Sequence, residues 1–503
     1  MKGLELSTWG GSTDVNIEDV LYPFLKTYER LPRGIKASVG STYRRLPQRV
    51  RLGARYGEFC KLAAGAESWS AEQVETYQFH ELRKVLLHAE AYSPYYARRF
   101  AEAGFHPADM SSLEDLASCP FTTRSELAGH LDDMAATKPS RFSRLYVATS
   151  GTSGIPVGIY LHKGVSRPKE QAFLEAQWRR AGYFDGARLA VLRGRPVSSR
   201  RQGPIATYDG TRDYLILSSW HLSAERLPEY LDEISRFRPD ILNAYPSAAL
   251  QLAEYLDRAG EKWPVPLRCV LAGSERFTLP QKHLLERTFG CRVYTWYGQT
   301  ERVVLAGEGR SSSDVLYFWP TYGYVEFGPP DPDGLQEVIG TSFHNLAMPL
   351  IRYRTGDYVR VHDPATDGPK EFDWPAVGAV HGREQEFLVT AAGRRIPVTG
   401  LNMHDRCYEN LYALQFFQER AGYAELRYVP SPAFDPARLP GIDAAIRRKL
   451  GDEIHLELRE VDQIEKTDRG KGKWLVSTLP DALSDSNAPV EARTPTPSPP
   501  TLP

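Results

Sequence analysis

A segment rich in glycine and hydroxyl residues is the first place in the chain where residue types and spacing suggest chemistry. Residues 149–158 read TSGTSGIPVG and follow a β-rich run. Such a segment offers backbone N–H groups and hydroxyls to phosphate oxygens, because glycine lets the backbone approach a ligand closely. The GxxxxGK[ST] pattern of the other common phosphate loop does not occur. Taken alone, the segment is equally well interpreted as a serine- and glycine-rich turn.

Five further short motifs follow this segment. They are Gly273-Ser274-Glu275, Tyr297-Gly298-Gln299-Thr300-Glu301, Arg354-Thr355-Gly356-Asp357, Gly382-Arg383 and Lys466-Thr467-Asp468-Arg469-Gly470-Lys471. With the glycine segment they stand in the order found in the adenylate-forming superfamily, which contains acyl-CoA synthetases, nonribosomal adenylation domains and luciferases. The chain resembles this superfamily over roughly residues 82–476. Each motif alone is a weak signal, but their ordered conjunction is a strong one.

Three stretches indicate a branch of that superfamily. LSSWHLSAERL, NAYPSAALQLAEYL and WYGQTER resemble phenylacetate-CoA ligase and its relatives in capsular polysaccharide gene clusters. The resemblance implies an enzyme that uses ATP and Mg²⁺ to convert a carboxylic acid, possible aromatic acids included, into its acyl-AMP with release of pyrophosphate. The acyl group would then pass to CoA or to another acceptor.

The resemblance also implies roles for the motif residues. The β and γ phosphates of ATP would lie against Thr149, Ser150, Gly151, Thr152, Ser153 and Gly154. Other residues on the nucleotide would be Gly273, Ser274, Glu275, Tyr297, Gly298, Gln299, Asp357 and Arg383. The Tyr297 ring can lie against adenine, and the Asp357 carboxylate can accept hydrogen bonds from both ribose hydroxyls. Thr300 can donate to the α-phosphate, and Glu301 offers the carboxylate that Mg²⁺ prefers.

A lysine near the C-terminus completes the expected catalytic set of Lys471, Thr300 and Glu301. Negative charge spreads over the phosphoryl oxygens during attack on the α-phosphorus, so a lysine is an expected stabiliser. The stretch RGKGKW holds Lys471 and Lys473, and the spacing to Trp474 favours Lys471. Without the upstream motifs, a solvated basic patch would be the better interpretation.

Two residues are candidates for binding the acid. His221 in SSWHLS and Tyr245 in NAYPS fall where related enzymes build the acid pocket. A core histidine and a tyrosine at a strand end are at least as good interpretations.

The chain departs from the superfamily pattern at two positions. Val157 stands where many members have a lysine in the phosphate loop, which removes a cation from near the pyrophosphate. Gln385 stands where an aspartate is usual at the hinge, so rotation of the small domain between two half-reactions is less securely implied.

Alternatives to a CoA ligase remain open at the level of sequence, since no CoA-specific signature is found. The chain could be a ligase for an amine or hydroxyl acceptor, or it could adenylate an unusual oxyacid or metabolite. It could also be an inactive nucleotide-binding homologue. The intact residues Thr300, Glu301, Asp357 and Lys471 argue against an inactive protein.

The elements that would position these residues follow an α/β rhythm. Apolar spacing predicts two helices in residues 71–104 joined at Ser93-Pro94, and a strand, glycine loop and strand in residues 144–163. Alternating elements follow, with helices expected at 169–181, 224–237 and 247–259 and strands at 188–193, 240–244 and 267–272. This rhythm predicts a largely parallel sheet whose binding crevice lies at the carboxyl ends of its strands.

The fold class is therefore α/β, with a large N-terminal part of several subdomains and a small mobile α+β domain. Short strands with glycine and proline punctuation after Trp296 predict a small antiparallel or β-barrel-like unit. We expect residues 1–381 to form the adenylation domain and residues 382–479 a small domain that carries the lysine motif. Residues 480–503 are rich in proline, serine and threonine, which predicts a disordered tail.

Composition limits the partners. The chain has 503 residues, with 62 Lys and Arg against 63 Asp and Glu, so charge gives no reason to expect nucleic acid. No run of about 18 apolar residues indicates insertion into a membrane. We expect a cytoplasmic enzyme whose partners are ATP, a small acid and an acceptor such as CoA, and a homodimer is compatible with the sequence.

Overall fold

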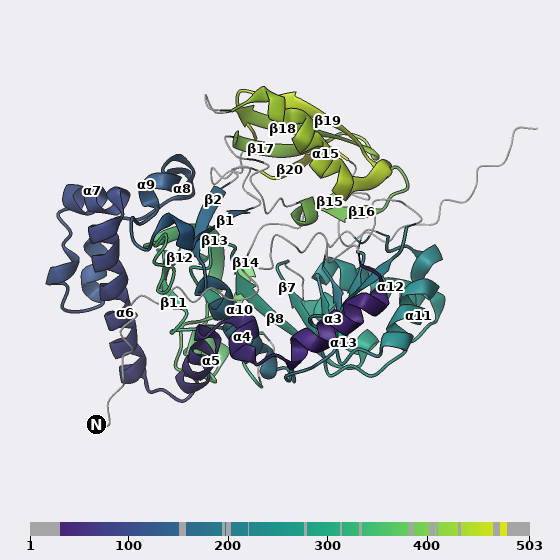
Figure 1. Cartoon of the computed structure of the whole chain (residues 1–503), viewed down its shortest axis with the longest axis horizontal. Coiled ribbons are helices and arrows are strands. Elements are labelled where there is room, and N and C mark those ends of the chain that lie inside the picture. Colours follow the sequence, from purple (N-terminus) through teal and green to yellow (C-terminus); the bar gives the residue numbers. More distant parts are fainter. Residues whose placement is uncertain are drawn as a thin grey trace, which may run out of the picture.

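In the computed structural model, the described residues are 31–149, 157–193, 197, 203–219, 221–275, 279–311, 314–330, 334–381, 387–401, 408, 411–430, 434–465 and 473–479. Their order in space is shown in Figure 1.

Helices dominate the N-terminal part of the described chain. They are α3 (Arg33–Arg45), α4 (Gln48–Leu52), α5 (Arg55–Ala66), α6 (Ala71–Tyr92), α7 (Pro94–Ala103), α8 (Arg124–Gly129) and α9 (Leu131–Met134). The two helices predicted in residues 71–104 are confirmed as α6 and α7. Ser93 separates them, because its side chain accepts a hydrogen bond from Tyr96 N and so starts α7 one residue after α6 has ended.

The two strands predicted on either side of the glycine segment are confirmed. Strand β1 (Arg144–Thr149) pairs antiparallel with β2 (Val157–His162), and Thr149 lies opposite Val157. The ladder thus ends at Thr149 and Val157, the two residues on either side of residues 150–156. The intervening residues 150–156 lie outside the described residues.

A twelve-stranded sheet forms the centre of the molecule, with the order β11-β12-β13-β14-β10-β9-β8-β7-β6-β3-β5-β4. Its parallel strands are β3 (Leu189–Leu192), β5 (Tyr214–Leu217), β6 (Ile241–Ala244), β7 (Cys269–Gly273) and β8 (Arg292–Gly298). The helices of this half are α10 (Ser166–Arg179), α11 (Leu227–Phe237), α12 (Pro246–Ala259) and α13 (Leu279–Phe289). The predicted α/β rhythm is confirmed. The hairpin of β4 (Ala206–Asp209) and β5 was not predicted.

The strands after Trp296 are antiparallel, as predicted. They are β9 (Leu305–Glu308), β10 (Leu316–Phe318), β11 (Gly323–Phe327), β12 (Gln336–Ser342), β13 (Tyr353–Val361) and β14 (Ala376–His381). These strands continue the same sheet as the parallel half instead of starting another, because β9 pairs directly with β8. The junction places the end of β8 beside strands from both halves.

The last part of the described chain has its own four-stranded sheet, in the order β19-β18-β17-β20, drawn in yellow-green in Figure 1. The elements here are β15 (Phe387–Val389), β16 (Arg395–Pro397), β17 (Leu411–Gln418), β18 (Tyr423–Pro430), α15 (Leu439–Leu450), β19 (His455–Glu460) and β20 (Leu475–Ser477). Helix α15 and the sheet share a core that includes Ile446, Phe416 and Trp474. This is an α+β arrangement, and the predicted domain boundaries stay predictions.

Short helices complete the described elements. They are η2 (Pro107–Asp109), η3 (Glu114–Ser118), η4 (Arg141–Ser143), η5 (Ala224–Arg226), α14 (Pro364–Asp367), η6 (Val398–Leu401), η8 (Pro436–Arg438) and η9 (Gly451–Glu453).

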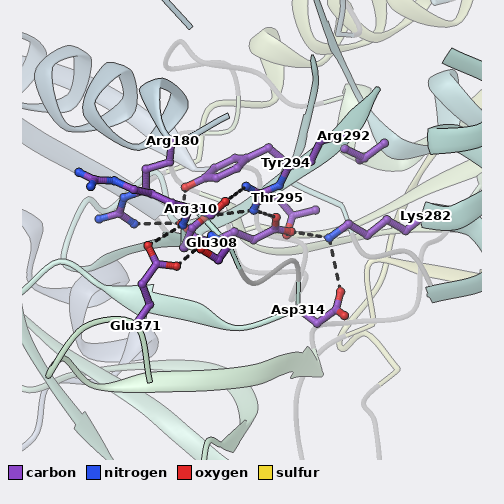
Figure 2. Close-up of polar contacts among 12 residues, drawn as sticks. Arg180, Lys282, Arg292, Tyr294, Thr295, Glu308, Arg310, Asp314 and Glu371 are labelled. Carbon is purple, nitrogen blue, oxygen red and sulfur yellow. Dashed lines mark hydrogen bonds and ion pairs between the residues drawn. The ribbon is translucent and has the colours of Figure 1, made fainter. Parts of the chain in front are cut away.

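A buried ionic cluster joins the two halves of the large sheet (Figure 2). The Glu308 side chain is 0 % exposed, at the end of β9. One of its oxygens lies 2.7 Å from Lys282 Nζ of α13, and the other lies 2.8 Å from Arg292 Nη2 of β8. Thr295 Oγ1 donates at 2.6 Å to Glu308 Oε1, the oxygen that also faces Lys282. Both oxygens of this carboxylate are therefore satisfied by groups from neighbouring elements, as a buried charge requires.

Candidate active site

Residues of four predicted motif segments meet at one edge of the large sheet. Gly298 ends β8, Gly273 ends β7, and Tyr245 directly follows β6. His221 lies shortly after β5. With β3 these strands form the consecutive parallel run β8-β7-β6-β3-β5, so their carboxyl ends lie along one edge, which is where α/β sheets usually bind ligands.

A direct hydrogen bond joins two of these motifs. Tyr297 OH donates to Asp357 Oδ2 at 2.9 Å, although the two residues lie 60 positions apart. Gln299 Nε2 donates to the same phenol oxygen at 2.5 Å. Burial, and next the Asp357 charge, raise the pKa of Tyr297 well above its usual value. The phenol is therefore protonated at neutral pH and orients the Asp357 carboxylate.

Strand β12 fixes the irregular part of β13 that presents Asp357. Gly356 has φ +69°, and its N–H donates to Glu337 Oε1 at 2.9 Å. Thr355 Oγ1 donates to Val338 O at 2.8 Å and accepts from Asp357 N at 3.0 Å. The positive φ suits glycine, which has no Cβ to clash. Backbone and side-chain bonds thus hold the carboxylate in place before any ligand binds.

Glu301 is buried beside a cation that the sequence did not reveal. Its side chain is 7 % exposed, and its Oε1 accepts from Arg124 Nη1 at 2.9 Å and from Tyr353 OH at 3.2 Å. Both of these bonds use Oε1. Burial lowers the pKa of Arg124, but Tyr353, Glu301 and Asp357 outweigh burial and raise it. Arg124 therefore contacts the expected metal carboxylate and is also stabilised by the charge of the expected ribose carboxylate.

Local structure explains how Arg124 reaches a residue 177 positions away. Thr122 N donates to Arg352 O, and Arg354 N donates to Thr122 O, so this segment pairs with the start of β13. Thr123 then caps α8, exchanging hydrogen bonds with Glu126 in a capping box. Arg124 is consequently the first residue of a helix that begins beside Tyr353. The sequence signal for this position is the capping-box pattern of Thr123 and Glu126. That pattern indicates where a helix starts, but it does not indicate a function for Arg124.

The turn after β8 is also well held. Arg302 N donates to Gln299 O at 3.1 Å, and Arg302 has φ +54°. Its Nη1 donates to Ser166 O of α10 at 2.8 Å. Thr300 and Glu301 lie inside this turn, so the anchored arginine fixes the position of both. Gln299 Oε1 is buried with no hydrogen-bond partner among the described residues.

The loop after β7 is packed closely and pinned at three residues. A Cβ on Gly273 would lie 2.6 Å from the Trp296 ring, so no side chain fits there. Ser274 has φ +74°, and its Oγ accepts from Arg193 Nη2 at 2.5 Å. Glu275 Oε2 accepts from Ser247 N, near the start of α12, at 3.0 Å. The loop presents its backbone at the same edge as Tyr297.

The two predicted acid-binding residues flank strand β3. His221 Nδ1 lies 2.7 Å from Ser218 Oγ, after β5, and Tyr245 caps α12 after β6. The guanidinium of Arg193 lies 5.0 Å from the centre of the Tyr245 ring. Arg193 directly follows β3 and was not predicted as a site residue. The structure places the three residues along one edge of the sheet.

No family model matches the chain, but individual known proteins are similar to it. The phenylacetate-coenzyme A ligase of Pseudomonas putida is 30% identical over 334 residues, which cover 64% of this chain and 73% of that enzyme. The enzyme of the same name from Aromatoleum evansii is 24% identical over 444 residues, covering 82% and 96%. Protein CapK of Staphylococcus aureus is 20% identical over 373 residues, covering 73% and 81%.

The chain belongs to the phenylacetate-CoA ligase family. It is therefore an adenylate-forming ligase, as its motifs predicted. The structure of 2-hydroxyisobutyryl-CoA ligase in complex with 2-HIB-AMP and CoA is similar at a TM-score of 0.52 and 18% identity, covering 82% of this chain and 91% of that one. This likeness confirms the fold. No helix in the described part of the chain is long and apolar enough to cross a membrane.

The described residues of this family member are compatible with a magnesium ion. They hold no group of three His, Cys, Asp or Glu side chains that could form a metal site on its own. Mg²⁺ does not need one, because it is usually bound by one or two carboxylates together with phosphates and water. Glu301 fits that requirement, since the hydrogen bonds from Arg124 and Tyr353 occupy Oε1 and leave Oε2 to a ligand.

Part of the predicted ligase site lies outside the described residues. This applies to Ser150, Gly151, Thr152, Ser153, Gly154, Arg383 and Lys471. Thr149 is the last residue of β1. Lys473, the alternative to Lys471, is described: its Nζ lies 3.9 Å from Glu465 Oε2, and its backbone N donates to Glu465 O. The roles assigned to these residues stay predictions.

Proposed function

We propose that this ligase activates a carboxylic acid with ATP and Mg²⁺ as an acyl-AMP, releases pyrophosphate, and transfers the acyl group to CoA. The observation that carries the proposal is the hydrogen bond from Tyr297 to Asp357 beside the Arg124–Glu301 ion pair. This arrangement supports one nucleotide site in which Asp357 binds the ribose diol and Glu301 binds the metal ion. The named activity of the relatives supports CoA as the acceptor.

Asp357 would hold the ribose. A carboxylate accepts hydrogen bonds with both oxygens, so it suits two adjacent hydroxyls. Tyr297 OH donates to Oδ2 and turns the carboxylate, while the raised pKa keeps that phenol protonated. The bonds that hold Thr355 and Gly356 make this position rigid. A preorganised acceptor lowers the cost of ordering the nucleotide on binding.

Glu301 would hold the metal ion, and Thr300 would donate to the α-phosphate. Magnesium, when bound, supplies positive charge that stabilises the phosphate oxygens. Arg124 and Tyr353 keep Glu301 Oε1 fixed, so Oε2 stays oriented. The guanidinium of Arg124 would also attract the polyphosphate. This cation compensates for the absence of a lysine at Val157, whose side chain is buried.

Lys471 would stabilise the charge that develops at the α-phosphorus. The contacts of Lys473 with Glu465 support this choice, because they engage both the ammonium group and the backbone N–H of the alternative lysine. Trp474 is 1 % exposed and packs on Phe416, which fixes the strand that follows the lysine segment.

The test is pyrophosphate release with a panel of aromatic and aliphatic acids. We expect activity in the wild type, a severe loss in Lys471→Ala and Glu301→Ala, and near-normal activity in Lys473→Ala. Turnover that needs neither Lys471 nor Glu301 would contradict the mechanism. Mass analysis after addition of CoA then tests the acceptor: acyl-CoA is expected, and an acyl-AMP that persists with CoA present would contradict transfer to CoA.

A further inference from the structure

Arg193 is a partly buried cation at the carboxyl end of the central strand β3. Its Nη1 donates to Asn243 Oδ1 at 3.2 Å, and its Nη2 donates to Ser274 Oγ at 2.5 Å and to Gly273 O at 3.3 Å. The guanidinium lies 5.2 Å from the centre of the Trp296 ring and 5.0 Å from that of Tyr245. Two aromatic rings and three neutral oxygens therefore hold it in a fixed position.

No carboxylate balances this charge directly among the described residues. The nearest acid on the adjacent loop, Glu275, acts on Arg193 through its charge, but its Oε2 accepts from Ser247 N. Burial lowers the pKa of Arg193, which expresses the cost of keeping the cation out of water. Contact with rings offsets part of that cost. A buried cation normally has an anionic partner, and the described residues give Arg193 no carboxylate within ion-pair distance.

Polar groups with remaining hydrogen-bonding capacity lie on Arg193 and on Ser247 at the start of α12. The hydrogen bonds of Arg193 to Asn243, Ser274 and Gly273 use three of its five N–H groups, and the Tyr245 phenol interacts with the remainder, Nε–H and one N–H of Nη1. Ser247 is 5 % exposed, and its Oγ is buried without a hydrogen-bond partner in the described part of the protein. Asn243, 7 % exposed, fixes the guanidinium from β6. Buried polar groups are rarely left unpaired unless a ligand or water satisfies them.

The location connects these groups to the acid. Arg193 lies on the strand between Tyr245 and His221, the two residues that resemblance assigns to the acid pocket. It also touches Ser274 of the loop assigned to the nucleotide. If the reacting carboxylate of the acid faces the α-phosphate, a group bound by Arg193 would be a second group of the same acid.

We propose that Arg193 binds an anionic tail group, and that the enzyme prefers an acid with a second carboxylate over an acid with an apolar tail. This inference rests on the proposed adenylation, because it assumes that the acid lies at this edge of the sheet. Because both N–H groups of Nη2 are engaged, the guanidinium would give the carboxylate one charge-assisted hydrogen bond, from Nη1 or Nε, together with its positive charge. Ser247 Oγ–H is the additional donor.

The test uses stable mimics of the acyl-AMP, so that binding is measured without turnover. We would prepare 5′-O-(N-acylsulfamoyl)adenosines in matched pairs, such as 4-carboxyphenylacetyl against 4-methylphenylacetyl, and aliphatic pairs of several lengths that end in carboxylate or methyl. Calorimetry would give the Kd of each on the wild type, Arg193→Met and Arg193→Lys. Thermal melting would verify that each variant is folded.

We expect at least one carboxylate probe to bind the wild type about 10- to 100-fold more tightly than its methyl partner, the range for a charged hydrogen-bonded pair. Arg193→Met should abolish that preference and leave the methyl probes nearly unchanged, and Arg193→Lys should restore part of it. Equal binding of every pair by the wild type would overturn the inference, as would an equal weakening of both partners in Arg193→Met. Failure of all probes to bind would instead reject the proposed function on which it rests.

Discussion

Two buried glutamates seven positions apart in the chain, Glu308 and Glu301, illustrate two uses of a buried carboxylate. Glu308 is 0 % exposed, and its two oxygens are shared among Lys282, Arg292 and Thr295 (Figure 2). Glu301 is 6 % exposed and has one described cation, Arg124, with both described bonds on Oε1. Both oxygens of the Glu308 carboxylate are therefore bound by other side chains. Among the described residues, the Glu301 carboxylate is held through Oε1, and its Oε2 remains for a ligand.

This difference indicates what each group is for. Burial raises the pKa of Glu308, and the charge of Lys282 opposes that rise, so the cluster balances desolvation against pairing. It stands at the join between the parallel and antiparallel halves of the sheet, away from the motif residues. Glu301 lies at the opposite end of β8, in the turn after Gly298. We infer that Glu308 stabilises the fold and that Glu301 serves a ligand.

The largest effect should come from Glu308→Ala. The change leaves Lys282 buried without its closest anion, and breaking such a pair costs about 3–5 kcal/mol of unfolding free energy. Denaturant titration would measure it. In the double variant with Lys282→Met, part of the loss should return, since the uncompensated charge is gone. A loss below about 1 kcal/mol for the single variant would mean that the cluster does not stabilise the fold.

Glu301→Gln should show the reverse pattern. Stability should change little, because the amide still accepts from Arg124 and Tyr353. Acyl-AMP formation should fall about 100-fold, as is usual when one electrostatic stabiliser of the transition state is removed. Paired melting and pyrophosphate assays would measure both quantities. If Glu301→Gln lowered the unfolding free energy as much as Glu308→Ala does, the two glutamates would not have the different roles inferred here.

Arg124→Met should affect both stability and nucleotide binding. It leaves Glu301 buried without a cation, which we expect to cost about 1.5–3 kcal/mol, the usual worth of a charged hydrogen bond. Added Mg²⁺ and ATP should stabilise this variant less than the wild type, because the variant lacks the cation that would attract the polyphosphate. Melting curves with and without Mg²⁺–ATP measure the difference, and Arg124→Lys is the matched control. Equal ligand-induced shifts in all three proteins would contradict the role given to Arg124.

Tyr297→Phe should have the smallest effect. It removes the hydrogen bond to Asp357 and keeps the ring, so the loss should be about 1 kcal/mol, or about fivefold in the KM for ATP. The KM for the acid should not move. Steady-state kinetics with each substrate varied in turn would decide, and a change confined to the acid KM would show that this edge does not bind the nucleotide.

Sequence reasoning recovered the parts of this molecule that local signals encode. Alternating apolar patterns gave the α/β rhythm, and ordered motifs gave the family and the edge where Tyr297 and Asp357 meet. Arg124 and Arg193 were missed because their roles depend on pairings across the chain: Arg124 reaches Glu301 through a bridge between Thr122 and Tyr353. A single sequence carries no signal for such contacts. The continuation of the sheet from β8 into β9 was missed for the same reason.

The most direct test of the account is to trap the acyl-AMP. Wild type, Asp357→Ala and Glu301→Gln would be mixed with ATP, Mg²⁺ and an acid that the panel identifies as a substrate, then quenched and assayed by mass spectrometry. The account predicts acyl-AMP and pyrophosphate in equal amounts from the wild type and a severe loss of both from each variant. Undiminished acyl-AMP in both variants would contradict the claim that this edge of the sheet is the adenylation site.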